Sequence, residues 1–427
     1  MQSLNDVLRQ PRSVEETGMN RGFLSDLALK TIYSVGGLRG QDIAERLHLP
    51  FGGVVEEVVT FLKREQLVSI TGSRGFDERE FRYSIASAGI ERVREALARS
   101  QYVGPAPVTL EAYQKVTRSQ TITDLAINQE DVESALSHLV ISSAMLMKIG
   151  PAVNSGRSIF LFGPPGSGKT VMALAMASML RGEVYIPYAV EVDGHVIKVF
   201  DNLNHQPVEP GERGNFTLFE GGRLDRRWIL IKRPIVLAGG ELTLESLDLV
   251  YDDTSKYYEA PFQMKANGGM FLIDDFGRQQ VRPRDLLNRW IVPLETRVDY
   301  LALHTGKKIE IPFDQLIVFA TNIDPKALVD EAFLRRIRHK IEVTDPTEEE
   351  FYGIFQRVVA DRGMAFDQEA FMYMMRQYYT KRKRELRAVH PRDIVDQIID
   401  IAHYRGVPPA LTEELIDQAC SSYFVEI

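Results

Sequence analysis

Gly163-Pro164-Pro165-Gly166-Ser167-Gly168-Lys169-Thr170 is the stretch that decides the fold of this chain. It follows the apolar run 158–162 and precedes the helix-forming run 171–177, which is the strand, loop and helix context of a phosphate-binding loop. Backbone N–H groups of such a loop turn inward around a polyphosphate, and the following helix adds its positive end. We therefore predict that the whole stretch binds a nucleoside triphosphate, with Lys169 reaching the β- and γ-phosphates and Thr170 holding Mg²⁺.

The composition is that of an ordinary globular protein. The 427 residues suggest about two to four domains, and 44% are apolar and 26% charged. No apolar stretch has the length of a membrane span and the N-terminus does not resemble a signal peptide, so we expect no membrane partner and a cytoplasmic location. The single cysteine, Cys420, excludes an intrachain disulfide and a multi-cysteine metal site. A net charge of −8 gives no global attraction to nucleic acid.

Two further apolar strands end in polar residues suited to phosphate chemistry. The run 270–273 ends in Asp274 and Asp275, and the run 315–320 ends in Thr321 and Asn322. Asp274 is predicted to orient Mg²⁺ through water at the carboxyl end of its strand. Asp275 is placed to polarise the attacking water, and the amide of Asn322 to position that water.

In motif order and spacing the chain resembles the AAA+ ATPases, from about Asp124 to the C-terminus. This resemblance implies a Walker A element at Lys169 and Thr170, a Walker B element at Asp274 and Asp275, and sensor 1 at Asn322. It also implies an arginine finger at Arg336, with Arg335 as the alternative, which would reach a neighbouring subunit. Sensor 2 is implied at Arg392 on a helical lid. The expected fold class is α/β: a P-loop core with a parallel sheet at 126–344 and an α-helical lid at 345–427. The lid helices are expected at 347–362, 367–380, 391–404 and 411–424.

One residue departs from the family pattern. Asp275 stands where the usual Walker B element has Glu, and its side chain is one methylene shorter. Because the base must come within hydrogen-bond reach of the water, we expect hydrolysis to persist but to be slowed or to demand tighter closure.

Two features indicate a branch of the AAA+ proteins. The lead-in 263–269 is similar to that of the enhancer-binding activators, but their GAFTGA loop is absent before Gln263. The segment 295–311 reads as two short strands around Gly306 and is similar to the pre-sensor-1 hairpin of the group that includes MoxR-type ATPases. Such hairpins face a ring's central pore, with a passive edge hairpin as the alternative.

The first 125 residues are expected to form three parts: a mobile tail at 1–22, a winged-helix domain at 23–100 and a stiff linker at 101–125. Three helices and a hairpin at 68–85 carry the winged-helix resemblance. The helix that would read DNA opens at 52–57 with two carboxylates and no basic residue, which favours a docking module. Wing residues partly offset this and leave DNA as an alternative partner: Arg74, Arg79 and Arg82.

We assign no catalytic or binding role to the remaining segments. We expect one helix at 129–149, then, between Lys169 and Asp274, an insertion with a hairpin turning at Asp193-Gly194 and an apolar piece at 228–238. His195 and His205 are interpreted as solvated loop residues rather than metal ligands. The basic run 381–384 is interpreted as a solvated helix end.

These features together predict an AAA+ ATPase, MoxR-like and chaperone-type, that uses ATP and Mg²⁺ and assembles with itself into a ring, expected to be a hexamer. The leading hypothesis for its function is remodelling or assembly of a protein partner. Two alternatives stay open: a DNA-associated ATPase or transcription regulator that uses the winged helix, and a slow nucleotide-dependent switch.

Overall fold

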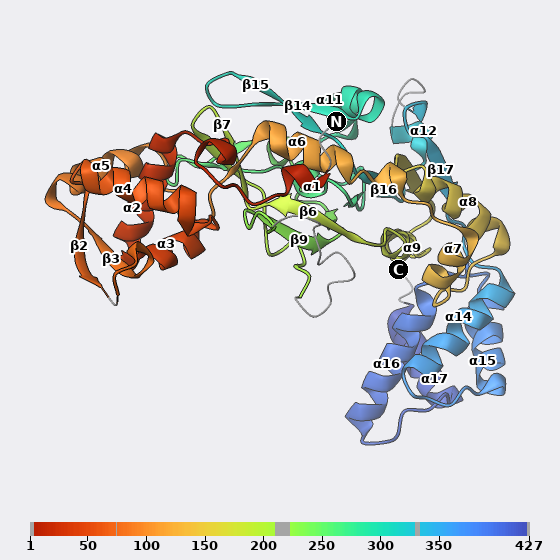
Figure 1. Ribbon diagram of the computed structural model, residues 1–427. Coiled ribbons are helices and arrows are strands. Elements are labelled where there is room, and N and C mark those ends of the chain that lie inside the picture. Colours follow the sequence, from red (N-terminus) through yellow and green to blue (C-terminus); the bar gives the residue numbers. More distant parts are fainter. Residues whose placement is uncertain (1–3, 74, 210–222, 329–333, 425–427) are drawn as a thin grey trace.

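The computed structural model describes residues 4–73, 75–209, 223–328 and 334–424. The molecule is elongated, with an N-terminal helical unit at one end, a helical lid at the other and the sheets between them (Figure 1). No helix among the described residues is long and apolar enough to cross a membrane. Arg74 lies outside the described residues.

A five-stranded parallel sheet forms the centre of the fold. Its strand order is β10-β13-β16-β5-β17, and each neighbouring pair is parallel. The order departs from the sequence order, so the connections cross over the sheet, as in doubly wound α/β folds. The strands are β5 (Ser158–Phe162), β10 (Ile235–Ala238), β13 (Met270–Ile273), β16 (Leu316–Thr321) and β17 (His339–Glu342). Both β13 and β16 are buried throughout, which is why they read as continuous apolar runs.

Helices cover both faces of this sheet. One buried cluster joins β5, β13 and β16 to residues of three helices, and a second joins the opposite face to α11. These helices are α7 (Gln129–Leu136), α8 (Ser143–Asn154), α9 (Lys169–Ser178) and α11 (Pro283–Thr296). Two short helices complete the core, α10 (Phe262–Lys265) and α12 (Pro325–Leu328). The structure confirms the expected α/β class with a parallel P-loop core.

The prediction of a single helix at 129–149 is wrong, because the chain forms two separate helices there, α7 and α8. Helix α7 ends at Leu136, and Ser142 begins the second helix by accepting a hydrogen bond from the Met145 N–H. Serine favours such a capping position over a helix interior. The intervening loop becomes part of the functional site.

The insertion between the P-loop and β13 builds most of a second, mixed sheet. Its order is β11-β12-β8-β7-β4, with β4 (Val108–Thr109), β7 (Ala189–Val192), β8 (His195–Lys198), β11 (Val250–Tyr251) and β12 (Tyr258–Glu259). The predicted tight turn is confirmed: Asp193 and Gly194 have φ of 51° and 83°, the left-handed pair of a type I′ hairpin. The apolar piece 228–238 divides between two sheets, because β9 (Trp228–Lys232) pairs with β6 (Glu183–Pro187) while β10 joins the core sheet.

The N-terminal unit packs four helices around a three-stranded sheet of order β1-β3-β2. Its helices are α2 (Arg21–Val35), α3 (Gly40–Leu47), α4 (Glu56–Arg64) and α5 (Ser87–Arg99), with a helical turn at Phe51–Val55 before α4. The strands are β1 (Leu38–Arg39), β2 (Val68–Ser73) and β3 (Phe81–Ile85). This order contains the helices and hairpin expected from the sequence, and β1 adds a short third strand.

Residues 4–20 are packed, so the expected mobile tail is wrong for the described part of it. The segment contains α1 (Leu4–Val7) and a short turn at Glu15–Thr17. Leu8 is fully buried and Val14 nearly so, and Arg9 forms a β-bridge with Leu224 of the insertion. The sequence did not indicate these contacts, because an extended segment that buries single residues against distant elements shows no hydrophobic periodicity.

The expected linker at 101–125 is also wrong. It contains β4, α6 (Leu110–Ser119) and a turn at Ile122–Asp124. Thr109 caps α6 by accepting from the Ala112 N–H, and the inward residues Tyr113 and Val116 are buried. This spacing of three is typical of an amphipathic helix. The segment is therefore part of the core rather than a spacer.

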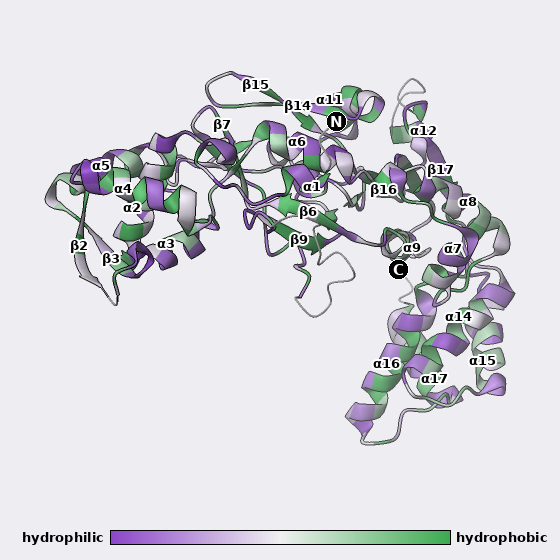
Figure 2. Cartoon of the chain, viewed as in Figure 1, coloured by the Kyte–Doolittle hydropathy of each residue, from purple (hydrophilic) through white to green (hydrophobic). Residues whose placement is uncertain are grey.

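The four expected lid helices are confirmed. They are α14 (Glu348–Asp361), α15 (Gln368–Met374) with its continuation Met375–Thr380, α16 (His390–Arg405) and α17 (Glu413–Tyr423). Figure 2 shows hydrophobic and hydrophilic residues alternating along these helices, as expected for a small bundle with one buried core. The run 381–384 follows the second helix as a turn, and its first three residues are exposed.

Truncating Leu8 tests whether the N-terminal segment belongs to the folded core. Leu8→Ala should lower the free energy of unfolding by about 2–5 kcal/mol, because it empties a fully buried site. Leu203→Ala is the matched control, since Leu203 is 94% exposed and should change stability by less than about 0.5 kcal/mol. Chemical denaturation measures both, and equal small effects would restore the mobile-tail interpretation.

Candidate functional site

The P-loop wraps the end of β5 in a conformation that requires glycine. Gly166 has a φ of 76°, and a Cβ there would lie 2.7 Å from the Val389 side chain of the lid. At Gly163 a Cβ would lie 2.0 Å from the carbonyl oxygen of Val343, which follows β17. The loop therefore passes close to two other segments and leaves its backbone free of side-chain obstruction.

Lys169 lies inside the loop and is 7% exposed. Its Nζ donates to the carbonyl oxygens of Gly163 at 3.1 Å and Pro164 at 2.8 Å. Burial lowers the pKa of Lys169, and the nearby carboxylates of Asp274 and Asp275 oppose that shift. The ammonium group is thus held by weak, exchangeable carbonyl contacts where a polyphosphate could replace them.

Thr170 and Asp274 come together although they lie 104 positions apart. The Thr170 hydroxyl donates to Asp274 Oδ2 at 2.7 Å, and the Asp275 N–H donates to Asp274 Oδ1 at 2.9 Å. A hydroxyl and a carboxylate are hard oxygen ligands, and Mg²⁺ in nucleotide sites takes one or two such ligands besides phosphates and water. The donor set therefore fits Mg²⁺.

Asp275 and Asn322 face each other across neighbouring strands. Asn322 Nδ2 donates to Asp275 Oδ1 at 3.3 Å, because β13 and β16 are adjacent and parallel and end at the same edge. Asp275 has a φ of 50°, a left-handed conformation that Asp adopts more readily than most residues. This sharp turn, in place of continued strand, directs the carboxylate towards the P-loop cavity.

Sequence reasoning missed Gln279, which braces this turn. Its Nε2 donates to the Asp274 carbonyl oxygen at 2.7 Å, and its Oε1 accepts from the Gly277 N–H at 2.8 Å. The position of Gln279, a polar residue soon after the buried strand β13, was the feature of the sequence that could have indicated this role.

A cavity of about 470 Å³ joins the P-loop to the lid. Asp274, Asp275, Asn322 and Arg392 all line it, together with residues 166–172. Sequence reasoning missed the rest of the wall, which comes from the loop between α7 and α8, from α14 and from the residues before α16: His138, Leu139, Val140, Ile141, Ile354, Arg357, Val358, Asp361, Ala388 and Val389. Its aliphatic members offer an apolar surface beside the phosphate loop, as a flat heterocyclic base requires.

The lid is tied directly to the P-loop. The Val389 N–H donates to the Gly166 carbonyl oxygen at 3.0 Å, and Arg387 forms an ion pair with Asp345 at 3.2 Å. Arg387 was also missed by sequence reasoning, and its charge helps to lower the pKa of Lys169. Arg392 lines the cavity from the start of α16 and pairs with Asp393 at 3.0 Å.

The structure does not bring Arg336 into this cavity. Arg336 precedes β17, and its carbonyl oxygen accepts from the Ser158 hydroxyl at the beginning of β5, whereas the P-loop follows the other end of that strand. Its Nε donates to Glu295 at 2.6 Å. A separate cavity of about 570 Å³ gathers it with other basic residues: Arg157, Arg335, Arg338 and Lys340.

The hairpin expected after α11 is confirmed. Strands β14 (Val298–Ala302) and β15 (Lys308–Pro312) pair antiparallel, and Leu301 and Ile311 of its inward face are fully buried. The tip residues His304 and Lys307 are exposed but contact the second sheet. The hairpin is therefore docked along its length.

The interpretation of His205 as a solvated loop residue is wrong. It is 2% exposed, its Nδ1 accepts from the Asp201 N–H at 3.0 Å, and its Nε2 lies 2.9 Å from the Lys265 carbonyl oxygen. His195 is partly buried against His304, with ring centroids 5.0 Å apart. Within the described ranges no cluster of three or more His, Cys, Asp or Glu residues could hold a metal ion.

The known proteins that this chain matches are similar to it only at a low level. A family model described as a domain of unknown function (DUF8689) matches residues 347–422, the lid. No curated protein matches the chain. The Holliday junction branch migration motor RuvB of Thermotoga maritima is similar at 14% identity and a TM-score of 0.37, over 70% of this chain and 71% of that one. NtrX from Brucella abortus in complex with ATP is similar at 13% identity and a TM-score of 0.41, over 69% of this chain and 59% of that one.

The internal geometry defines the fold of the core. A parallel sheet of order β10-β13-β16-β5-β17, a glycine-rich loop after its β5 strand and a helical lid closing over that loop make up a P-loop α/β fold. The structure thus confirms the class of fold expected from the sequence.

The lid should lose stability in acid through His390. Burial, helped by Arg384 and Arg387, lowers the pKa of His390 to about 4 from its ordinary value of 6.5, and its Nδ1 lies 3.1 Å from the Tyr379 hydroxyl. Because the pKa of His390 is lower in the folded state than in the unfolded state, protonation of this side chain favours unfolding. The free energy of unfolding is therefore unaffected by His390 above about pH 6.5 and decreases as the pH falls towards 4. Thermal unfolding at pH 7.5 and pH 5 should show a smaller drop for His390→Gln than for the parent. His403→Gln, an exposed change on the same helix, should leave the parent's pH dependence intact, and an unchanged drop in His390→Gln would contradict the assignment.

Proposed function

We propose that this chain is an AAA+ ATPase that binds ATP with Mg²⁺ and hydrolyses it at the boundary between subunits of a ring. The observation that carries the proposal is the convergence of Lys169, Thr170, Asp274, Asp275 and Asn322 on one cavity that the lid covers. These residues come from three strand ends, so their meeting is a property of the fold rather than of one motif.

Each side chain has a role that its position supports. Lys169 exchanges its loop carbonyls for the β- and γ-phosphates. Thr170 and Asp274 would hold Mg²⁺, which neutralises developing charge on the phosphoryl oxygens. Asp275 polarises the attacking water and Asn322 positions it, since the two are in contact. Arg392 approaches the phosphates from the lid.

The position of Arg336 supports a ring rather than an isolated subunit. Strand β5 separates it from its own P-loop by five residues, on the order of 16 Å, which is beyond the reach of an arginine side chain. A second copy with its cavity against this edge would receive Arg336 as an arginine finger. We propose a closed ring, with a hexamer as the expected size.

The hairpin between α11 and β16 supports the MoxR-like branch, because it occupies the pre-sensor-1 position. In this branch the cycle remodels or assembles a protein partner, and we propose the same chaperone-type role in the cytoplasm. The slow-switch alternative rests on Asp275, but its contact with Asn322 at 3.3 Å supports a working water site.

The N-terminal unit supports a docking role over DNA reading. Its helices and hairpin have the order of a winged helix, and α4 is the element that would enter the major groove. The approach to α4 is covered, since a Cβ on Gly53 would lie 2.1 Å from the Arg12 carbonyl oxygen. Arg79 of the wing lies over the Phe51 ring at 5.7 Å. The DNA-associated alternative requires the N-terminal segment to move away.

Removing the P-loop cation tests the binding site. Lys169→Ala should weaken ATP binding by about two orders of magnitude, because charge-assisted contacts to phosphate are each worth about 1.5–3 kcal/mol. Lys148→Ala, a change of an exposed residue of α8, is the matched control and should bind ATP like the parent. Calorimetric titration measures both, and parent-like affinity in Lys169→Ala would refute the site.

Mixing two inactive variants tests the ring. Arg336→Ala should bind ATP normally while hydrolysis falls by about 10³-fold or more, because a finger acts on the transition state. Adding Lys169→Ala protein should restore part of the turnover, since each variant supplies what the other lacks. Arg335→Ala, a change in the adjacent arginine, should retain most activity. Absence of rescue in confirmed mixed rings would contradict an in-trans role, and a parent without turnover would favour the slow switch.

A further inference from the structure

The hairpin tip is held by the second sheet through specific contacts. The His304 N–H donates to the Tyr258 hydroxyl at 2.9 Å, and the same hydroxyl bonds to the His304 ring at Nδ1. The His304 ring also stacks on Tyr251, with centroids 4.4 Å apart and planes 23° apart. Lys307 forms an ion pair with Asp193, in the turn between β7 and β8.

The hydrogen bonds between Tyr258 and His304 fix the position of the hairpin tip more closely than apolar packing would. Tyr258 is fully buried, so its hydroxyl depends on His304 for the two hydrogen bonds that the structure gives it. A displacement of the tip must either break these bonds, at the cost of an unsatisfied buried hydroxyl, or carry the sheet with it.

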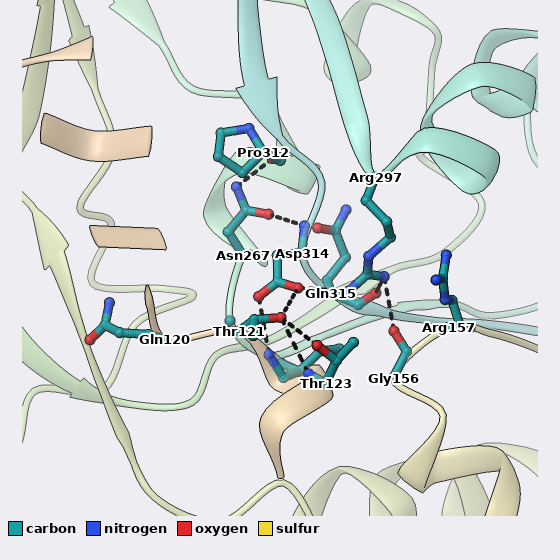
Figure 3. Close-up of polar contacts among 12 residues, drawn as sticks. Gln120, Thr121, Thr123, Gly156, Arg157, Asn267, Arg297, Pro312, Asp314 and Gln315 are labelled. Carbon is teal, nitrogen blue, oxygen red and sulfur yellow. Dashed lines mark hydrogen bonds and ion pairs between the residues drawn. The ribbon is translucent and has the colours of Figure 1, made fainter. Parts of the chain in front are cut away.

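The base of the hairpin is joined to the beginnings of the strands that carry the site. Arg297, just before β14, donates to Asp314 at 2.6 Å and to the Gly156 carbonyl oxygen at 2.9 Å (Figure 3). Gly156 leads into β5 and Asp314 into β16. Asn267, which leads into β13, donates to the Pro312 carbonyl oxygen at the end of β15 and accepts from the Asp314 N–H, each at 2.8 Å.

The opposite side of the second sheet contacts the N-terminal unit. Ala189 of β7 and Val196 of β8 belong to the buried cluster of that unit. The Gln101 N–H donates to the Ser255 carbonyl oxygen at 2.8 Å, and Lys256 donates to the Ala98 carbonyl oxygen at 2.8 Å. Ser255 and Lys256 lie in the connection between β11 and β12, the two strands that hold His304.

The arrangement in space agrees with these contacts. Figure 1 shows the hairpin β14–β15 extending along the molecule towards the N-terminal unit, with β7 lying between them. The insertion, to which the sequence analysis assigned no role, therefore lies between the hairpin and the N-terminal unit.

We infer that the second sheet is a mechanical joint through which the hairpin repositions the N-terminal unit when nucleotide binds. His304 and Tyr258 are the positioning residues of this joint. The inference deepens the proposed ATPase function and rests on it. The partner bound by the N-terminal unit is thus moved by a lever within the subunit, and the hairpin tip serves as a link rather than as a free pore contact.

Distance measurement between two labels tests the joint in the full chain. Arg94→Cys on α5 and Met147→Cys on α8 introduce exposed labelling sites in the N-terminal unit and the core. The native Cys420 is fully buried and its pKa is raised to about 12 by burial, so it reacts poorly with thiol reagents. Pulsed electron–electron double resonance then gives the label separation without nucleotide, with ADP and with a non-hydrolysable ATP analogue.

Three variants in this labelled background isolate the joint. Tyr258→Phe keeps the ring but removes the hydroxyl and with it both hydrogen bonds to His304. His304→Ala removes the ring contacts with Tyr258 and Tyr251 but keeps the backbone N–H. Thr305→Ala changes the neighbouring exposed tip residue as a control. The parent and Thr305→Ala should change label separation on binding the analogue. Tyr258→Phe and His304→Ala should lose that change while their ATP affinity and hydrolysis stay within a few-fold of the parent.

Other outcomes overturn the inference in distinguishable ways. A change in separation that survives in both Tyr258→Phe and His304→Ala shows that the joint is not at the tip. A parent that binds the analogue without any change in separation removes the joint and leaves the ATPase proposal standing. A parent that binds no nucleotide in the same titration removes both. Thermal unfolding of each variant identifies misfolding, and the conservative Tyr258→Phe then decides.

Discussion

The ion pair between the half-buried Arg297 and the buried Asp314 is the contact on which the architecture depends. Asp314 is 7% exposed, and besides Arg297 it accepts from the Thr121 hydroxyl at 2.8 Å and the Ile122 N–H at 3.1 Å. One carboxylate thereby joins the hairpin base, the beginning of β16 and the segment that follows α6. Such a pair adds little net stability over an apolar replacement, but losing one partner leaves a buried charge at a cost of about 3–5 kcal/mol. Its value is the register that it imposes on the elements around it.

Fixed strand beginnings determine where the strand ends meet. Because β5, β13 and β16 are parallel neighbours, anchoring them at one edge places the P-loop, Asp275 and Asn322 together at the other. The same anchoring sets Arg336 beside the beginning of β5, at the end opposite the P-loop. In the proposed ring, the residues that bind the phosphates and the arginine that completes hydrolysis would therefore belong to different subunits.

The sequence predicted what depends on local pattern. The P-loop, the two strands ending in Asp275 and Asn322, the Asp193-Gly194 turn and the lid helices are all written in consecutive residues, and the structure has each of them. Long-range contacts escaped: Leu8 is buried by elements far along the chain, and Arg387 reaches the P-loop only once the lid has folded. The helix α6 had a readable signal, the spacing of Tyr113 and Val116, but the prolines before it suggested a spacer. The break at Ser142 was likewise readable as a cap inside an apolar run.

The β-bridge between Arg9 and Leu224 also has a consequence for biosynthesis. Arg9 can pair only after Leu224 has been synthesised, 215 positions later. At about 5–20 residues per second this delay lasts roughly 10 to 40 s. Until then the apolar side chain of Leu8 cannot be buried as it is in the folded protein. The nascent chain therefore exposes a short apolar segment that could aggregate. Chaperone binding to the segment around Leu8 in the nascent chain, and its release as the insertion emerges, would follow from this one long-range pairing.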